Sequence, residues 1–130
     1  MFSFSKKKKG ELALYPTVLQ RAALLQKATL GGPLVMLNLL RFKNKKAYSG
    51  YAKGVKSVSL DFGIEFLFFG EVITTVIGKK VSYHAVALVR YPSIKAFIRF
   101  ASSKPMKGLK KEREAGLEGQ QLIAIKEVEF

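Results

Sequence analysis

The sequence contains no cysteine and no tryptophan, and its only histidine is His84. Without cysteine, disulfides, thiol chemistry and cysteine-based zinc or iron–sulfur sites are excluded. No run of about 18 apolar residues is present, so we expect no segment that spans a membrane. The opening "MFSFSKKKKGE" lacks the apolar region and cleavage site of a secretory signal. We therefore expect a cytoplasmic protein.

Acidic residues are also scarce, with 9 Asp and Glu against 23 Lys and Arg and a formal net charge of +14 at pH 7. Such a charge suits nucleic acid, anionic lipid or an anionic ligand, and it equally suits a solvated lysine-rich surface. The basic residues are spread along the chain, which favours the solvated surface. No cluster with metal-ligand spacing, glycine-rich phosphate loop or nucleophile elbow is present, so we predict no metal and no cofactor.

The length of 130 residues and the hydrophobic fraction of 48% predict a basic flexible tail at residues 1–10 and one domain at residues 11–130. Hydrophobic periodicity predicts an N-terminal helix after Pro16 and then the order β-α-β-β-α-β. The expected strands are residues 34–42, 65–77, 81–91 and 120–128, and the later helices are residues 47–63, 92–102 and 105–114.

This order predicts an α+β, ferredoxin-like fold with an antiparallel sheet and helices on one face. Right-handed crossovers give the strand order 4-1-3-2. The first two strands are apolar on both faces, although the helices cover only one. A homodimer that packs through the bare sheet faces is the simplest explanation.

Four segments, "VMLNLLRFK", "AYSGYAKG", "HAVALVRYPSIKAFIRFASS" and "REAGLEGQQLI", resemble an uncharacterised branch of the dimeric α/β-barrel superfamily. Its signatures are NLL-x-F, Y-x-x-Y, LVRYPS and R-x-AGL, and the match covers nearly all of residues 16–128. The resemblance implies a homodimer whose two sheets form a barrel. The superfamily includes cofactor-independent monooxygenases, haem-degrading enzymes, isomerases and peroxidases. The branch typically has Trp-Asp where this chain has Tyr83-His84, so a role for that aspartate does not carry over.

The predicted topology brings polar residues of separate segments to one end of the sheet. The carboxyl ends of the first two strands lie beside the amino ends of the other two. The candidates at this end are Asn38 and His84 as catalytic residues and Arg41, Tyr48, Tyr51, Tyr83 and Arg113 as substrate-binding residues.

Each candidate also has a purely structural interpretation. Asn38 interrupts an apolar strand, so its amide either bonds to neighbouring core groups or stabilises an enolate-like oxygen. His84 either is structural or moves a proton. Arg113 lies on the inward side of a short helix, so its partner is a distant acid or an anionic ligand. Tyr48 and Tyr51 lie on an apolar helical stripe and are most simply core residues.

Arg90 lies at the opposite end of the sheet, and we expect it to form a structural ion pair with Glu65 or Glu127.

The function most consistent with the sequence is binding of a small anionic or oxygenated aromatic molecule between sheet and helices, with or without cofactor-independent oxidation or isomerisation. A non-catalytic structural or regulatory dimer is the alternative. A nucleic-acid binder is disfavoured because the strand "HAVALVRY" lacks the exposed aromatics of RNA-recognition modules.

Overall fold

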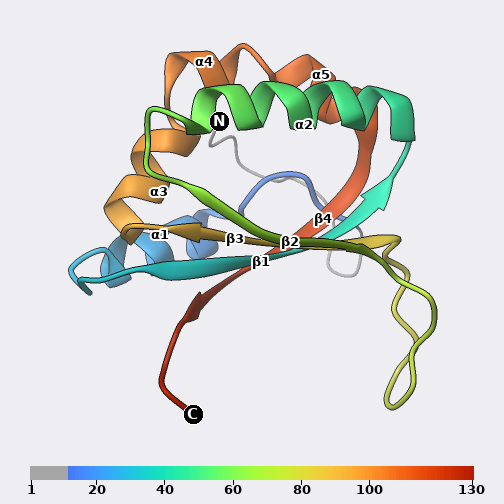
Figure 1. Cartoon of the computed structure of the whole chain (residues 1–130), viewed down its shortest axis with the longest axis horizontal. Helices are drawn as coiled ribbons and strands as arrows, with labels where there is room; N and C mark the ends of the chain where they lie inside the picture. The colour runs from blue at the N-terminus through green and yellow to red at the C-terminus, as the bar shows by residue number, and fades with distance from the viewer. Residues whose placement is uncertain (1–11) are drawn as a thin grey trace.

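The computed structural model describes residues 12–130, and the predicted basic tail at residues 1–10 lies outside the described residues. Five helices and four strands follow one another in this part of the chain (Figure 1). They are α1 (Val18–Lys27), β1 (Leu34–Phe42), α2 (Lys45–Ser59), β2 (Glu65–Glu71), β3 (Ala85–Tyr91), α3 (Ile94–Ala101), α4 (Lys104–Lys107), α5 (Lys110–Gly116) and β4 (Leu117–Lys126). None of the described helices is long and apolar enough to cross a membrane.

The four strands form one antiparallel sheet in the order β2-β3-β1-β4. This is the predicted 4-1-3-2 arrangement, and the ferredoxin-like α+β fold is confirmed. β1 has the predicted bounds, because its apolar run is delimited by a glycine–proline turn and by the N-cap of α2. Helices α2, α4 and α5 lie over one face of the sheet in Figure 1.

The second and third strands are shorter than the sequence predicted. β2 ends at Glu71 rather than at residue 77, and the last pairing beyond it is the bond from the Val72 N–H to the His84 carbonyl, 2.8 Å. Further residues have β-forming side chains but no neighbouring strand to pair with, and Ile73 is 96% exposed. The connection between β2 and β3 therefore extends below the sheet in Figure 1.

Two local features differ from what the residue pattern indicates. A glycine inside a strand, as at Gly70, is typical of a bulge or bend, but the register of β2 against β3 shifts between Phe66 and Phe68. The single helix expected at residues 105–114 is divided into α4 and α5, because the chain leaves helical geometry at Leu109 after the C-cap Gly108.

The core lies between the sheet and the helices. Leu34 and Met36 of β1 are buried there, and Phe97 of α3 packs edge-on against Tyr91 of β3 with ring centroids 5.0 Å apart. Successive residues of a strand point to opposite faces, so Leu37 belongs to the face away from the helices.

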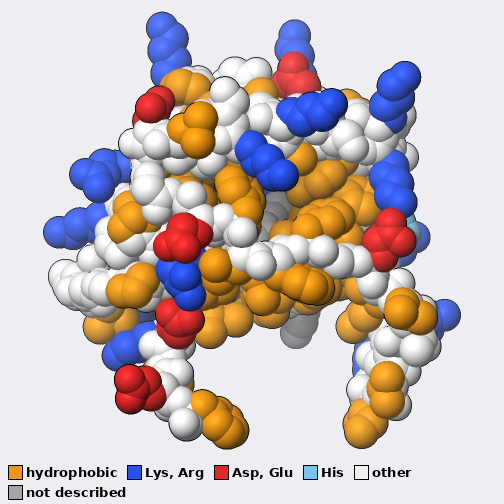
Figure 2. All heavy atoms as spheres, in the orientation of Figure 1, with side chains coloured by type: hydrophobic (Ala, Val, Ile, Leu, Met, Phe, Trp, Pro, Cys, Tyr) orange, Lys and Arg blue, Asp and Glu red, His pale blue; other side chains and the backbone are white. Residues whose placement is uncertain are grey.

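That second face is also apolar. Phe68, Leu88, Leu37 and Ile123 are register partners in turn, so they form one row across all four strands. Phe68 is 56% exposed and Ile123 is 39% exposed. Figure 2 shows hydrophobic side chains on this underside, between the β2–β3 connection and the C-terminal segment. The sheet thus has one covered face and one uncovered apolar face within the described chain.

Helix α1 lies beside β4 and is attached to it at one end. A capping box starts the helix: the Thr17 hydroxyl accepts from the Gln20 N–H, and the Gln20 side chain accepts from the Thr17 N–H. Upstream of the cap, the Ala13 carbonyl accepts from the Gln120 N–H at 2.8 Å. The segment before α1 therefore continues the hydrogen bonding of the sheet for a short distance.

Candidate functional site

A chain of three polar side chains crosses the layer between the sheet and α5, and we call it the polar chain: Arg113, Gln120 and Asn38. Arg113 Nη2 donates to Gln120 Oε1 at 2.6 Å and to the Leu14 carbonyl at 2.6 Å. Gln120 Nε2 donates to Asn38 Oδ1 at 2.8 Å. The bonds link α5, β4, β1 and the segment before α1, so each side chain holds the next in one orientation.

The amide of Asn38 is fully engaged by protein groups. Besides accepting from Gln120, it donates through Nδ2 to the Met36 carbonyl at 3.3 Å and to the Ala87 carbonyl at 3.4 Å. A half-buried amide at this strand position is stable because its polar atoms are paired. Of the two interpretations of Asn38, the contacts match the core amide satisfied by its neighbours.

Arg113 is the least compensated group of the polar chain. It is only 7% exposed, and Nη1 is buried without a hydrogen-bond partner. Within residues 12–130, no carboxylate forms an ion pair with it. Its guanidinium lies 5.2 Å from the centre of the Tyr15 ring, a cation–π contact that offsets part of the burial cost. A bound anion would supply the counter-charge that this buried guanidinium lacks.

A cavity of about 90 Å³ adjoins the polar chain between the sheet and the helices. The lining residues with polar side chains are Asn38, Tyr48, Tyr51, Tyr91, Arg113 and Gln120. The rings of Tyr48 and Tyr51 are 5.7 Å apart. Burial raises the pKa of both tyrosines, and for each of them the charge of Arg113 acts in the opposite direction. The phenols are therefore neutral hydrogen-bonding groups at neutral pH.

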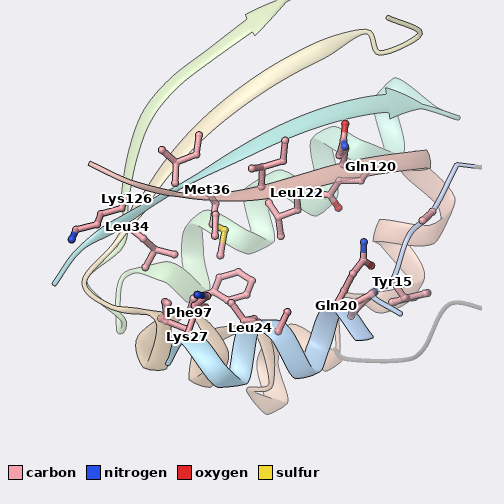
Figure 3. A pocket seen from close by; sticks show the side chains of 18 of the residues that line it. Tyr15, Gln20, Leu24, Lys27, Leu34, Met36, Phe97, Gln120, Leu122 and Lys126 are labelled. Atoms are coloured by element: carbon pink, nitrogen blue, oxygen red, sulfur yellow. The ribbon is translucent and has the colours of Figure 1, made fainter. Parts of the chain in front are cut away.

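That cavity alone is small, because ordinary ligand pockets occupy about 300–1,000 Å³. A second hollow of about 830 Å³ lies between α1 with its preceding segment and β4, and we call it the α1–β4 cleft (Figure 3). Phe97, Arg113, Gln120 and Leu122 line both spaces. The polar chain thus stands at the boundary between the small cavity and a cleft of ligand size.

The structure brings four of the predicted residues together and separates the other three from the cavity. Asn38, Tyr48, Tyr51 and Arg113 line it, whereas Tyr83 lines the α1–β4 cleft. Arg41 is paired with Glu118 at 3.1 Å and also donates to the Ser82 carbonyl. Its alternation relative to Asn38 places it on the other face of the sheet.

The His84 side chain forms a hydrogen bond with the backbone of β1. Its Nδ1 accepts from the Phe42 N–H at 2.9 Å, and its ring stacks on the Phe42 ring at 5.8 Å. The backbone N–H of His84 donates to the Leu40 carbonyl at 2.8 Å, and this bond extends the pairing of β1 and β3. In the hydrogen bond from the Phe42 N–H, Nδ1 is the acceptor, which leaves Nε2 as the other polar atom of the ring.

Gln120 and Tyr15 are members of the site that the sequence reasoning missed. Gln120 shares the helix-facing side of β4 with Leu122, two residues further on, and the alternation of "GQQLI" is the signal that could have revealed it. Tyr15 carried no comparable pattern. Its hydroxyl donates to Glu114 at 2.9 Å, and burial together with that bond raises its pKa to about 12.

The chain is therefore a ferredoxin-like α+β protein with a buried arginine at a sheet–helix site. It belongs to the DUF1330 family, a domain of unknown function, whose model matches residues 34–128. No curated protein matches it.

Solved structures share the fold. A protein of unknown function from Rhodopseudomonas palustris has a TM-score of 0.81 at 24% identity, over 93% of this chain and 99% of that one. SnoaB, a cofactor-independent oxygenase from Streptomyces nogalater, has a TM-score of 0.57 at 7% identity, over 77% and 97%. A dimeric ferredoxin-like protein of unknown function from Thermobifida fusca has a TM-score of 0.51 at 10% identity, over 73% and 91%.

Proposed function

We propose that this protein binds a small anionic or oxygenated aromatic molecule, with Arg113 contacting the acidic or oxygenated group. The observation that carries the proposal is the buried guanidinium with an unpartnered Nη1 and no ion-paired carboxylate in residues 12–130. The polar chain fixes its direction, because Gln120 and the Leu14 carbonyl hold Nη2. The ring of the ligand lies on the side of the α1–β4 cleft, since the inner cavity of about 90 Å³ is too small for it.

Calorimetric titration with benzoate, 4-hydroxybenzoate and neutral benzyl alcohol tests this proposal. We expect the two carboxylates to bind and Arg113→Met to weaken them at least tenfold, about 1.4 kcal/mol. Arg99→Met is the matched control, because Arg99 is exposed on α3. Thermal unfolding of both variants verifies that they fold. Absence of carboxylate binding, or equal Kd values for the two arginine variants, contradicts the proposal.

Catalysis is a second candidate, supported by the fold shared with the oxygenase SnoaB. In that proposal Asn38 orients an enolate-like oxygen and His84 moves a proton during cofactor-independent oxidation or isomerisation. Both side chains are already engaged, Asn38 by Gln120 and His84 by the Phe42 N–H. The contacts therefore support a binding role more directly than a catalytic one, and a turnover assay with Asn38→Ala and His84→Ala separates the two.

We further propose that two copies pack through the uncovered sheet face. The apolar row from Phe68 to Ile123 crosses that face, and the similar protein from Thermobifida fusca is described as dimeric. Sedimentation should show a dimer that Phe68→Glu dissociates. Leu60→Glu should leave the mass unchanged, because Leu60 is 84% exposed just beyond α2. A monomeric wild-type protein would contradict this proposal and a regulatory dimer alike.

The basic surface gives less support to nucleic-acid binding. Lys and Arg side chains project from several sides of the molecule in Figure 2 rather than from one stripe. A steep salt dependence of binding to generic RNA or DNA would favour that alternative.

A further inference from the structure

Helix α1 makes few contacts with the sheet beside it. It contains no buried residue, and the partly buried Leu24, together with the C-cap residue Ala28, packs against the core. Across the gap, Leu122 of β4 is 40% exposed although it lies on the helix-facing side. In Figure 3, Leu122 projects from β4 toward α1, whereas Met36, at the inner side of the cleft, is only 2% exposed. Helix α1 therefore covers this side of β4 only in part, and the α1–β4 cleft remains open beside Leu24.

The α1 segment is connected to the sheet at both ends. At one end, the Ala13 and Leu14 carbonyls accept from the Gln120 N–H and from Arg113 Nη2. At the other end, Gly32 turns the chain with φ 87° into β1. The α1 segment is therefore joined to the sheet on both sides of the helix, and the cleft lies between these two connections.

The cleft is positively charged. Its described lining includes three cationic side chains, Lys27, Arg113 and Lys126, and no acidic one. Figure 3 places Lys27 and Lys126 at one end and Gln120 at the other. From Gln120 to Lys126 the strand spans about 20 Å at about 3.3 Å per residue. A cleft of this length has room for an apolar body longer than a single ring, attached to an acidic end.

We infer that the α1–β4 cleft binds an elongated amphipathic carboxylate, such as a medium- or long-chain acyl acid, with α1 as one wall. The inference rests on the proposed function for the acidic end, which lies at Arg113 and Gln120. The chain runs along Leu122 and Met36 and passes beneath Leu24. The stems of Lys27 and Lys126 cover the far end while their ammonium groups stay in water.

A series of straight-chain acids tests the inference by calorimetry on the full-length protein. We expect the Kd to fall about tenfold or more at each step from butyrate to octanoate to dodecanoate, because each methylene leaves water. Ala23→Asp places a carboxylate in the cleft and should abolish this gain. Ala22→Asp is the matched control, since it makes the same change on the same helix outside the cleft lining.

The variants separate this inference from the proposed function. If benzoate binds through Arg113 but chain length does not change the Kd, the cleft inference is overturned and the proposed function stands. Equal effects of Ala22→Asp and Ala23→Asp also overturn it, as does a dimer that Ala23→Asp dissociates, because a second copy then fills the cleft. If Arg113→Met leaves both benzoate and dodecanoate binding unchanged, the proposed function fails as well.

Discussion

Asn38 and Gln120 are 82 residues apart in the sequence, and a hydrogen bond of 2.8 Å joins Gln120 Nε2 to Asn38 Oδ1. Gln120 accepts from Arg113 with its other amide atom, so the asparagine and the arginine are coupled through one side chain. The bond also fixes the amide orientations, because Asn38 uses its NH₂ group for the Met36 and Ala87 carbonyls. Removing the central glutamine therefore disturbs both ends of the polar chain.

We predict that Gln120→Ala lowers the free energy of unfolding by about 1–3 kcal/mol, because it leaves Asn38 Oδ1 and Arg113 Nη2 each one partner short. Urea unfolding at neutral pH measures the change. Gln121→Ala is the control, since Gln121 is exposed and should change stability by less than about 0.5 kcal/mol. Equal losses for the two variants would show that the polar chain contributes nothing specific.

Much of the fold was predictable, because local patterns determined it. Serine is a preferred N-cap residue, and the Ser93 hydroxyl caps α3 by accepting from the Ala96 N–H. The ion pairs expected for Arg90 are both present, with Glu65 at 3.4 Å and Glu127 at 2.9 Å. The site was harder to predict, because the candidate residues share one end of the sheet but do not all lie on the same face.

Arg41 illustrates the difference. It lies three residues after Asn38 on the same strand, and alternation sends the two side chains to opposite faces. Gln120 required more than alternation, because its partner depends on the register of β1 against β4, which shifts between Arg41 and Phe42. Long-range register of this kind is set by tertiary packing, so one sequence does not determine it.

We predict opposite effects for two glycine substitutions in helices. A Cβ on Gly116 would lie 2.7 Å from the Tyr48 backbone nitrogen, so Gly116→Ala must displace α5 from α2 and should cost more than about 2 kcal/mol. A Cβ on Gly50 meets nothing within 4 Å, so Gly50→Ala should stabilise α2 by about 0.5–1 kcal/mol. Thermal and urea unfolding of both variants check the pair. A tolerated Gly116→Ala would contradict the close approach of α5 to α2.

We predict that tyrosine ionisation destabilises the protein at alkaline pH. Burial raises the pKa of Tyr48, Tyr51 and Tyr91, and burial with the Glu114 bond raises that of Tyr15 to about 12. The folded state therefore holds these protons more tightly than the unfolded state, whose tyrosines titrate at about pH 10. The stabilising contribution is complete below about pH 10 and is lost as pH rises through the folded-state values.

Urea unfolding of the wild type and of Tyr48→Phe at several pH values measures this loss. The stability of the wild type relative to the variant should fall above about pH 10, because phenylalanine has no proton to retain. Absorbance at the phenolate band should show delayed ionisation while the far-UV circular dichroism stays native. Titration of all tyrosines near pH 10 in the folded protein would contradict the prediction.

The last prediction concerns His84, which the sequence suggested as a catalytic residue. His84→Ala should lower the free energy of unfolding by about 1 kcal/mol, because the Phe42 N–H loses its acceptor. It should leave the Kd for benzoate within twofold, since His84 does not line the cavity or the α1–β4 cleft. His84→Asn is the matched variant: its Oδ1 can accept from the same N–H, so it should recover part of the stability. A tenfold change in the Kd or in turnover without a change in stability would instead place His84 in the ligand site.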